Sequence, residues 1–136
     1  MRVVVDTNVF ISSFFGGKPR RVIDLWKKGE ITICLSPDII DECVAVLRRL
    51  GLEEEPEIGE LIDLFAKAHH MLFTAKIPAL RLIMEDPGDD KFIACAVALK
   101  AKVIVTGDKH LKATGSYMGI KILSPAEFLA FFRHRP

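Results

Sequence analysis

The stretch RVVVDTNVF, residues 2–10, contains the pattern on which the fold prediction rests. Three consecutive β-branched residues, Val3 to Val5, are typical of a strand that is buried on both faces of a sheet. Asp6 follows directly, and the next apolar residues have helical spacing up to the glycine pair at 16 and 17. A buried strand that leads through an acidic residue into a helix indicates an α/β fold.

The same alternation continues along the chain. Serine followed by proline, at 36–37 and at 124–125, combines a good N-cap with a residue suited to the first helical position. We expect helices over residues 19–28, 37–50, 58–72, 89–100 and from 125 onward, a short helix after Asp108, and strands over 31–35, 73–77, 102–106 and 120–123. Residues 73–85 give the weakest pattern. The alternation predicts one domain, residues 1–136, with a parallel sheet covered by helices on both faces.

The composition limits the classes of protein to which the chain can belong. Half of its 136 residues are hydrophobic, so we expect a globular chain with a substantial core. Nineteen basic residues nearly balance eighteen acidic ones, so nucleic-acid binding would need a local basic patch. The three cysteines are scattered among apolar residues, which is typical of reduced intracellular proteins. With no signal peptide and no apolar run long enough to span a bilayer, we expect a cytoplasmic protein without a membrane partner.

Four acidic residues fall where the predicted strands end or the following helices begin. Asp6 follows the first strand, and Asp108 follows the strand 102–106 after one glycine. Asp90 begins a helix, and Glu42 lies in the second turn of the helix after strand 31–35. In an open parallel sheet, ligands bind outside the carboxyl ends of the strands. Crowded carboxylates repel each other unless a cation neutralises them, and oxygen ligands suit Mg²⁺ or Mn²⁺. Such ions can activate water and stabilise the leaving oxygen in phosphodiester cleavage.

Each of these acids also has a simpler explanation when it is taken alone. Asp6, Asp90 and Asp108 could serve only as helix caps, because aspartate is favoured at that position. Glu42 could be an ordinary solvated residue, and helical periodicity favours it over Asp41 only slightly as the inward-facing acid. The functional interpretation gains support because several acids share the same kind of position.

Five short motifs, in this order, resemble the PIN domain family. They are DTNV at 6–9, Ser36-Pro37 with Glu42 in the following helix, DPGDDKF at 86–92, VTGD at 105–108 and SPAEFL at 124–129. The resemblance covers essentially the whole chain. It is greatest to the prokaryotic branch described as toxin components of toxin–antitoxin pairs (VapC-like).

The resemblance implies a three-layer α/β/α sandwich around a central parallel β-sheet and a ribonuclease that depends on Mg²⁺ or Mn²⁺. It places Asp6, Glu42, Asp90 and Asp108 on the family's catalytic, metal-binding acidic positions. The supporting polar positions that it implies are Asn8, Thr106 and Asp89. The partners that it implies are RNA, a cognate antitoxin protein and a second copy of the chain in a homodimer.

A phosphate backbone needs cations near the acids. The candidates are Lys18, Arg20, Arg21 and Lys109, each of which could equally be an ordinary solvated residue. Two other functions remain as alternatives. A phosphotransfer enzyme on a similar sheet would place its acids differently, and Asn8 counts against the dehalogenase-type arrangement. A catalytically idle PIN-like module that only binds RNA or protein would not need all four acids.

Overall fold

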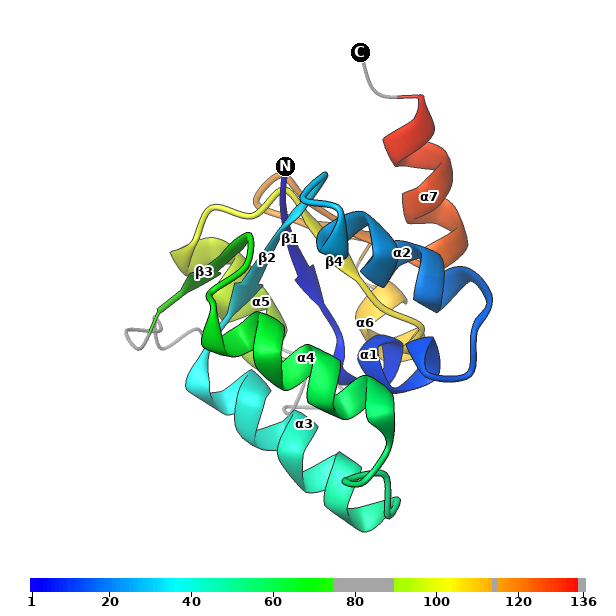
Figure 1. Cartoon of the computed structure of the whole chain (residues 1–136). Helices are drawn as coiled ribbons and strands as arrows, with labels where there is room; N and C mark the ends of the chain where they lie inside the picture. The colour runs from blue at the N-terminus through cyan, green and yellow to red at the C-terminus, as the bar shows by residue number, and fades with distance from the viewer. Residues whose placement is uncertain (75–89, 114, 135–136) are drawn as a thin grey trace.

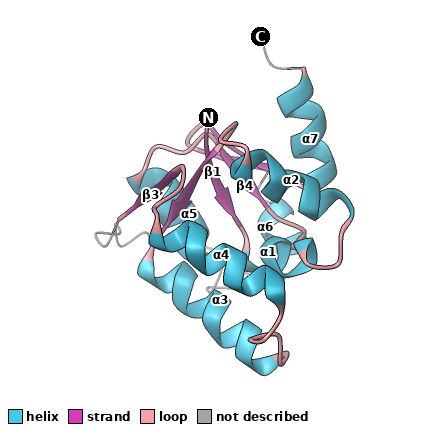
Figure 2. Ribbon diagram, in the orientation of Figure 1, coloured by secondary structure: helices cyan, strands magenta, loops and turns pink. Residues whose placement is uncertain are grey.

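The computed structural model describes residues 1–74, 90–113 and 115–134. Strands alternate with helices through most of this part of the chain, as Figures 1 and 2 show. The strands are β1 (Arg2–Val5), β2 (Thr32–Leu35), β3 (Met71–Phe73), β4 (Val103–Val105), β5 (Ser116–Tyr117) and β6 (Ile120–Leu123). The helices are α1 (Thr7–Ser13), α2 (Gly17–Lys27), α3 (Pro37–Arg49), α4 (Pro56–Ala66), α5 (Asp90–Ala98), α6 (Lys109–Ala113) and α7 (Pro125–Arg133).

The described strands form one sheet in the order β3-β2-β1-β4-β6-β5. All neighbouring pairs are parallel except β5 with β6, which are antiparallel. In the centre of the sheet, Val3 of β1 lies opposite Ile33 of β2 on one side and Val103 of β4 on the other. All three side chains are fully buried, which is why these strands are almost entirely apolar.

The direction in which the chain adds strands reverses between β1 and β4. From β1 it moves to β2 and β3, through α1 and α2 and then through α3 and α4. It then crosses through α5, which packs on β1, β2 and β4, and continues outward to β4 and β6. Figure 1 shows α2 and α4 in front of the sheet and α5 behind it. This three-layer arrangement makes the carboxyl ends of β1 and β4 the topological switch point, where open α/β sheets bind ligands.

Local rules account for where several helices begin. Ser36 accepts a hydrogen bond from the backbone N–H of Ile39 and caps α3, with proline at the first helical position. Ser124 and Glu127 form a reciprocal capping box at the start of α7. The two serine–proline helix starts that the sequence predicted are therefore confirmed.

The prediction of one helix over residues 58–72 was too long. Helix α4 ends at Ala66, and Ala68 and His70 take left-handed backbone conformations with φ of 50° and 42°. This reversal brings Leu72 into β3, where it pairs with Cys34 of β2. The strand expected over 73–77 thus lies earlier, at Met71–Phe73, and residues 75–77 of that prediction lie outside the described residues.

The antiparallel strand β5 was not predicted from the sequence. It contains two residues and returns to β6 through a turn at Met118 and Gly119, so the sheet is mostly rather than wholly parallel. In the described segments, no helix has the length and apolar character needed to cross a bilayer.

Candidate active site at the ends of strands β1 and β4

Asp6 leaves the end of β1 directly into the switch point. Its backbone N–H donates to the carbonyl of Val105 at the end of β4, which fixes the two strand ends side by side. Its Oδ1 atom accepts from the backbone N–H of Asn8, 3.2 Å away, and so caps α1. The residue is only 4% exposed. The capping role expected for Asp6 therefore exists, and it leaves a buried carboxylate at the sheet edge.

Thr106 connects this carboxylate to Asp108. Its Oγ1 donates to Oδ2 of Asp6 at 2.6 Å and accepts from the backbone N–H of Asp108 at 3.0 Å. Oδ1 of Asp108 in turn accepts from the N–H of Leu111 and caps the short helix α6. One buried hydroxyl thus sets the positions of two acidic residues that come from the two strands at the switch point.

Glu42 reaches the same region from α3. Its Oε2 accepts a 2.6 Å hydrogen bond from the hydroxyl of Thr7, the residue after Asp6. Its Oε1 lies 3.1 Å from the ammonium of Lys91 in α5. Asp41 is exposed whereas Glu42 is half-buried, so the weak preference of helical periodicity for Glu42 agrees with the structure.

The electrostatics of the three acids are mutually unfavourable. Burial raises the pKa of Asp6, and the negative charges of Glu42 and Asp108 raise it further. The hydrogen bonds from Thr106 and Asn8 act in the opposite direction and lower that pKa. The net shift is upward, which means that the folded protein disfavours the charged form of Asp6 when no cation is present.

The structure describes less of the other predicted site residues, Asp90, Asp89 and Asn8. Asp90 begins α5 as predicted, but its side chain lies outside the described part of the structure, as does the whole of Asp89. Asn8 is exposed in the first turn of α1, and its backbone rather than its side chain contacts Asp6. The roles of these residues stay predictions.

The four basic candidates lie on two elements. Lys18, Arg20 and Arg21 are exposed in the first turns of α2, and Lys109 is exposed at the start of α6, next to Asp108. Arg20 donates from Nε to the carbonyl of Ser13 and from a terminal nitrogen to that of Phe14. These bonds satisfy carbonyls at the end of α1, which gives Arg20 a structural role. Contact of any of the four with RNA stays a prediction.

Two residues that touch Glu42 were missed as site residues. Thr7 was read only as part of the DTNV motif, although it is 2% exposed and donates directly to the carboxylate. Lys91 was read as part of the DPGDDKF motif. Its ion pair joins positions 49 residues apart, so no local pattern in the sequence indicates it. The only sequence signal was that each residue is adjacent to a predicted acidic ligand.

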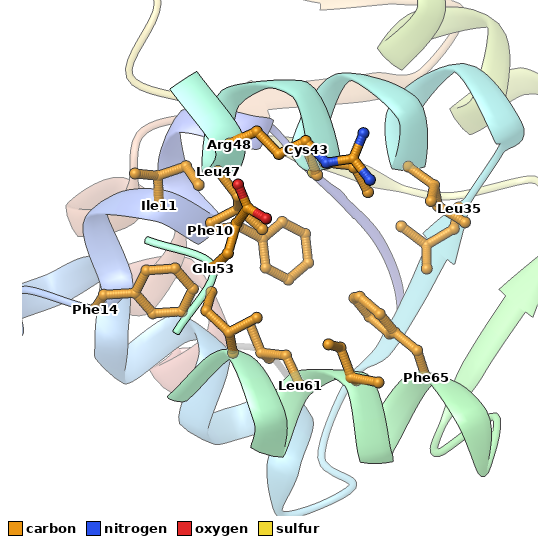
Figure 3. A pocket seen from close by; sticks show the side chains of 14 residues that line it. Phe10, Ile11, Phe14, Leu35, Cys43, Leu47, Arg48, Glu53, Leu61 and Phe65 are labelled. Carbon is orange, nitrogen blue, oxygen red and sulfur yellow. The ribbon is translucent and has the colours of Figure 1, made fainter. Parts of the chain in front are cut away.

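A separate apolar cavity of about 310 Å³ lies between α1, α3 and α4. Phe10 of α1, Phe14 just after α1, and Leu61 and Phe65 of α4 project toward it, with Cys43 on the α3 side (Figure 3). Asp6, Glu42 and Asp108, the candidate acids whose side chains the structure describes, do not line it. Arg48 and Glu53 also line the cavity, but most of its wall is apolar, so burial of a charged phosphodiester there is costly and the cavity does not suit the chemistry that the acids suggest.

Comparison with known proteins now identifies the family. A PIN domain profile matches residues 2–110, and the chain belongs to the PIN domain family. The matched region contains all four candidate acids. The chain is also 31% identical over 147 residues to "Uncharacterized protein MJ1680" of Methanocaldococcus jannaschii, an alignment that covers 97% of this chain and 92% of the relative. The resemblance to PIN domains and the α/β/α fold predicted from it are thereby confirmed.

PIN domains are generally nucleases, and they usually use divalent metal ions. The donor set here fits such an ion in kind, because the three acids described at the switch point offer only carboxylate oxygens, as Mg²⁺ and Mn²⁺ prefer. Burial raises the pKa of Asp6, and the charges of Glu42 and Asp108 add to that rise, so a bound cation would favour its carboxylate form. Among the side chains that the structure describes, however, no group of three or more acids, histidines or cysteines lies close enough together to hold a metal.

Proposed function

We propose that the protein is an endoribonuclease that depends on Mg²⁺ or Mn²⁺ and hydrolyses RNA phosphodiester bonds. The observation that carries this proposal is the buried carboxylate of Asp6 at the switch point, facing the charges of Glu42 and Asp108. A structural cap has no need of two further acids around it, whereas a cation site does. RNA as the substrate is supported by the resemblance to the toxin branch of the family.

In this proposal Asp6, Glu42 and Asp108, together with Asp90, hold the divalent cation. The bound ion would supply Lewis-acid stabilisation of the developing charge and would lower the pKa of a water molecule. Thr106 orients the carboxylate of Asp6 through its 2.6 Å hydrogen bond, and Thr7 orients that of Glu42 in the same way. Such supporting hydrogen bonds typically matter nearly as much as the ligands.

The basic residues would bind the phosphates on either side of the cleaved bond. Lys18 and Arg21 are exposed on α2, and Lys109 follows Asp108 directly. The net charge of the whole chain is only +1, so attraction of RNA depends on such local groups.

The test is cleavage of a panel of single-stranded and structured RNAs in EDTA, Mg²⁺ and Mn²⁺. Wild type is compared with Asp90→Asn, Asp6→Asn and, as a matched control, Asp63→Asn, which removes an exposed acid on α4. We expect cleavage only with a divalent ion, and only in wild type and the control. Full activity of purified Asp90→Asn would overturn the assignment of Asp90. Cleavage that persists in EDTA would overturn metal dependence.

We further propose that the protein acts in the cytoplasm as the toxin of a toxin–antitoxin pair, with a cognate antitoxin protein as its partner. The support is the resemblance to toxin-type PIN chains. Induced expression of wild type should then arrest bacterial growth, and expression of Asp6→Asn should not. Growth that is equally unaffected by both proteins, when both accumulate to the same level, would contradict the toxin role and leave the nuclease proposal intact.

Two observations favour a second candidate, a PIN-like module that binds RNA or protein without cleaving it. Glu42 is already neutralised by Lys91, and no described group of acids is close enough to hold a metal. In that case no condition in the RNA panel would give cleavage, and Mn²⁺ would raise the melting temperature of wild type no more than that of Asp6→Asn.

A further inference from the structure

Lys91 is the second residue of α5 and forms an ion pair with Glu42 of α3 beside the candidate active site. Its ammonium lies 3.1 Å from Oε1 of Glu42. The Lys91 side chain is 19% exposed and that of Glu42 is 35% exposed, so this pair is more shielded than an ordinary surface pair. The contact joins α3 to α5, and Lys91 directly follows Asp90 in the sequence.

Both carboxylate oxygens of Glu42 already have protein donors. Thr7 donates to Oε2 and is neutral, whereas Lys91 contacts Oε1 and carries a positive charge. A divalent ion held by Glu42 would stabilise the same negative charge as Lys91, and two cations several ångströms apart repel each other. Occupation of the site by the ion and the pairing of Lys91 with Glu42 therefore oppose each other.

Lys91 has the properties needed to leave Glu42. A lysine ammonium is a compact charge on a flexible four-carbon stem, so it can change partner without movement of the backbone. It also lies 5.5 Å from the centroid of the Phe92 ring, whose face offers a weak alternative contact. A lysine released next to metal-binding acids is well placed for a phosphate, to which lysine binds as a point charge.

We infer that Lys91 is the internal counter-ion of the acidic site: it pairs with Glu42 when the protein is metal-free, leaves Glu42 when a divalent cation binds, and then binds a phosphate of the RNA substrate. This inference rests on the proposed function for the identity of the substrate. It adds a substrate-binding residue whose availability depends on the metal.

The first test measures the affinity of the metal-free protein for Mn²⁺ by titration calorimetry. Lys91→Met keeps the length of the stem and removes the charge. Lys27→Met is the matched control, because Lys27 forms an ion pair of the same 3.1 Å length with Glu60, away from the acids. We expect Lys91→Met to bind Mn²⁺ on the order of 10-fold more tightly than wild type, since one nearby positive charge is gone. The control should bind as wild type does. If Lys91→Met binds Mn²⁺ with equal or weaker affinity than wild type, the inferred competition between Lys91 and the ion for Glu42 is overturned.

The second test measures binding of a fluorescent single-stranded RNA in EDTA and in Ca²⁺, with the RNA confirmed intact on a gel. In Ca²⁺, Lys91→Met should bind the RNA more weakly than wild type. A plot of log affinity against log salt concentration should also have a slope that is shallower by about 0.7, which corresponds to the loss of one phosphate contact. In EDTA the two should bind alike, because Glu42 holds Lys91. Lys91→Arg keeps the charge and should restore binding in Ca²⁺. Equal losses with and without the ion would overturn the dependence of this contact on the metal, and no loss in Ca²⁺ would overturn the phosphate role.

The two proposals can fail separately. If wild type cleaves no RNA under any condition, the proposed nuclease function fails, and the Mn²⁺ titration still decides whether Lys91 competes with the ion. If cleavage depends on metal but Lys91→Met binds RNA as wild type does in Ca²⁺, the phosphate role of Lys91 is overturned and the nuclease stands.

Discussion

The hydroxyl of Thr106 donates a 2.6 Å hydrogen bond to the carboxylate of Asp6, a residue 100 positions earlier in the chain. Thr106 is fully buried and Asp6 nearly so. The same hydroxyl accepts the backbone N–H of Asp108. Thr106 therefore holds together two acids of the candidate site, and its hydrogen bond partly offsets the rise that burial causes in the pKa of Asp6.

Replacing Thr106 with valine should move the pH dependence of metal binding to higher pH. Without the hydroxyl, the pKa of Asp6 rises further, so a higher pH is needed to form the carboxylate that we propose binds the ion. We expect Mn²⁺ affinity below neutral pH to fall by roughly 10- to 100-fold, the usual effect of losing a hydrogen bond that supports a ligand. Calorimetry between pH 5 and 8 measures this. Thr106→Ser keeps the hydroxyl and should behave as wild type, and an unshifted profile in the valine variant would contradict the role.

Asp6→Asn should stabilise the metal-free protein at neutral pH. Because the pKa of Asp6 is raised in the folded state, the folded protein binds this proton more tightly than the unfolded chain does. That contribution to stability is present below the unfolded pKa of 3.8 and is lost as pH rises through the raised folded pKa. Asparagine carries no charge and its one side-chain oxygen still caps α1, although its amide nitrogen cannot accept the hydrogen bond from Thr106. In EDTA, we expect the free energy of unfolding of Asp6→Asn in urea to exceed that of wild type by about 1 kcal/mol.

The extra stability of Asp6→Asn over wild type should grow as pH rises from 3.8 through the raised folded pKa of Asp6. It should vanish at the acidic end of this range, where Asp6 is protonated in wild type as well. Asp63→Asn, at an exposed position on α4, should show no such trend. A stability difference between Asp6→Asn and wild type that is independent of pH would show that loss of charge is not its cause.

Thr7→Val should reduce nuclease activity more than it reduces stability. The hydroxyl of Thr7 donates to Oε2 of Glu42 at 2.6 Å, and valine fills nearly the same buried volume without that donor. Glu42 keeps its contact with Lys91 and partial access to water, so the free energy of unfolding should change by less than about 1 kcal/mol. Cleavage should fall roughly 10- to 100-fold. Thr7→Ser should recover most of the activity, and failure of serine to do so would point to packing instead of the hydrogen bond.

Gly29→Ala should destabilise the fold more than Gly51→Ala does. Both glycines have left-handed backbones, with φ of +76° and +68°, and alanine costs roughly 1–2 kcal/mol in that region. At Gly29 the added Cβ would also lie 2.6 Å from Nε2 of His70, whereas at Gly51 no atom lies within 4 Å. We expect the alanine at 29 to cost about 1 kcal/mol more in urea unfolding. Equal costs would mean that His70 moves aside freely.

The parts of the fold that follow from short-range rules could be predicted from the sequence. Ser36 and Ser124 cap helices through hydrogen bonds to residues three positions away, so the chain itself contains the whole signal. The apolar strands β1 and β4 could be recognised for the same reason. The end of α4 could not, because the left-handed turn at Ala68 and His70 contains no glycine or proline to indicate it.

The candidate site was only partly predictable. The rule that ligands bind at the carboxyl ends of parallel strands was enough to bring Asp6 and Asp108 to one place. The partners of Glu42 were not predictable, because Thr7 and Lys91 reach it across 35 and 49 positions and depend on how α3 packs against α1 and α5. The antiparallel strand β5 has only two residues, which are too few to show an alternation of apolar and polar side chains.

The pairing of β1 with β4 also fixes when the site can exist during protein synthesis. Val3 to Val5 leave the ribosome before Val103 to Val105, their partners on one side. At about 5–20 residues per second, the ribosome needs roughly 5–20 s to make the intervening chain. During that interval Asp6 has neither Thr106 nor Asp108 beside it. A nascent chain therefore cannot assemble this acidic cluster until Thr106 and Asp108 have been translated.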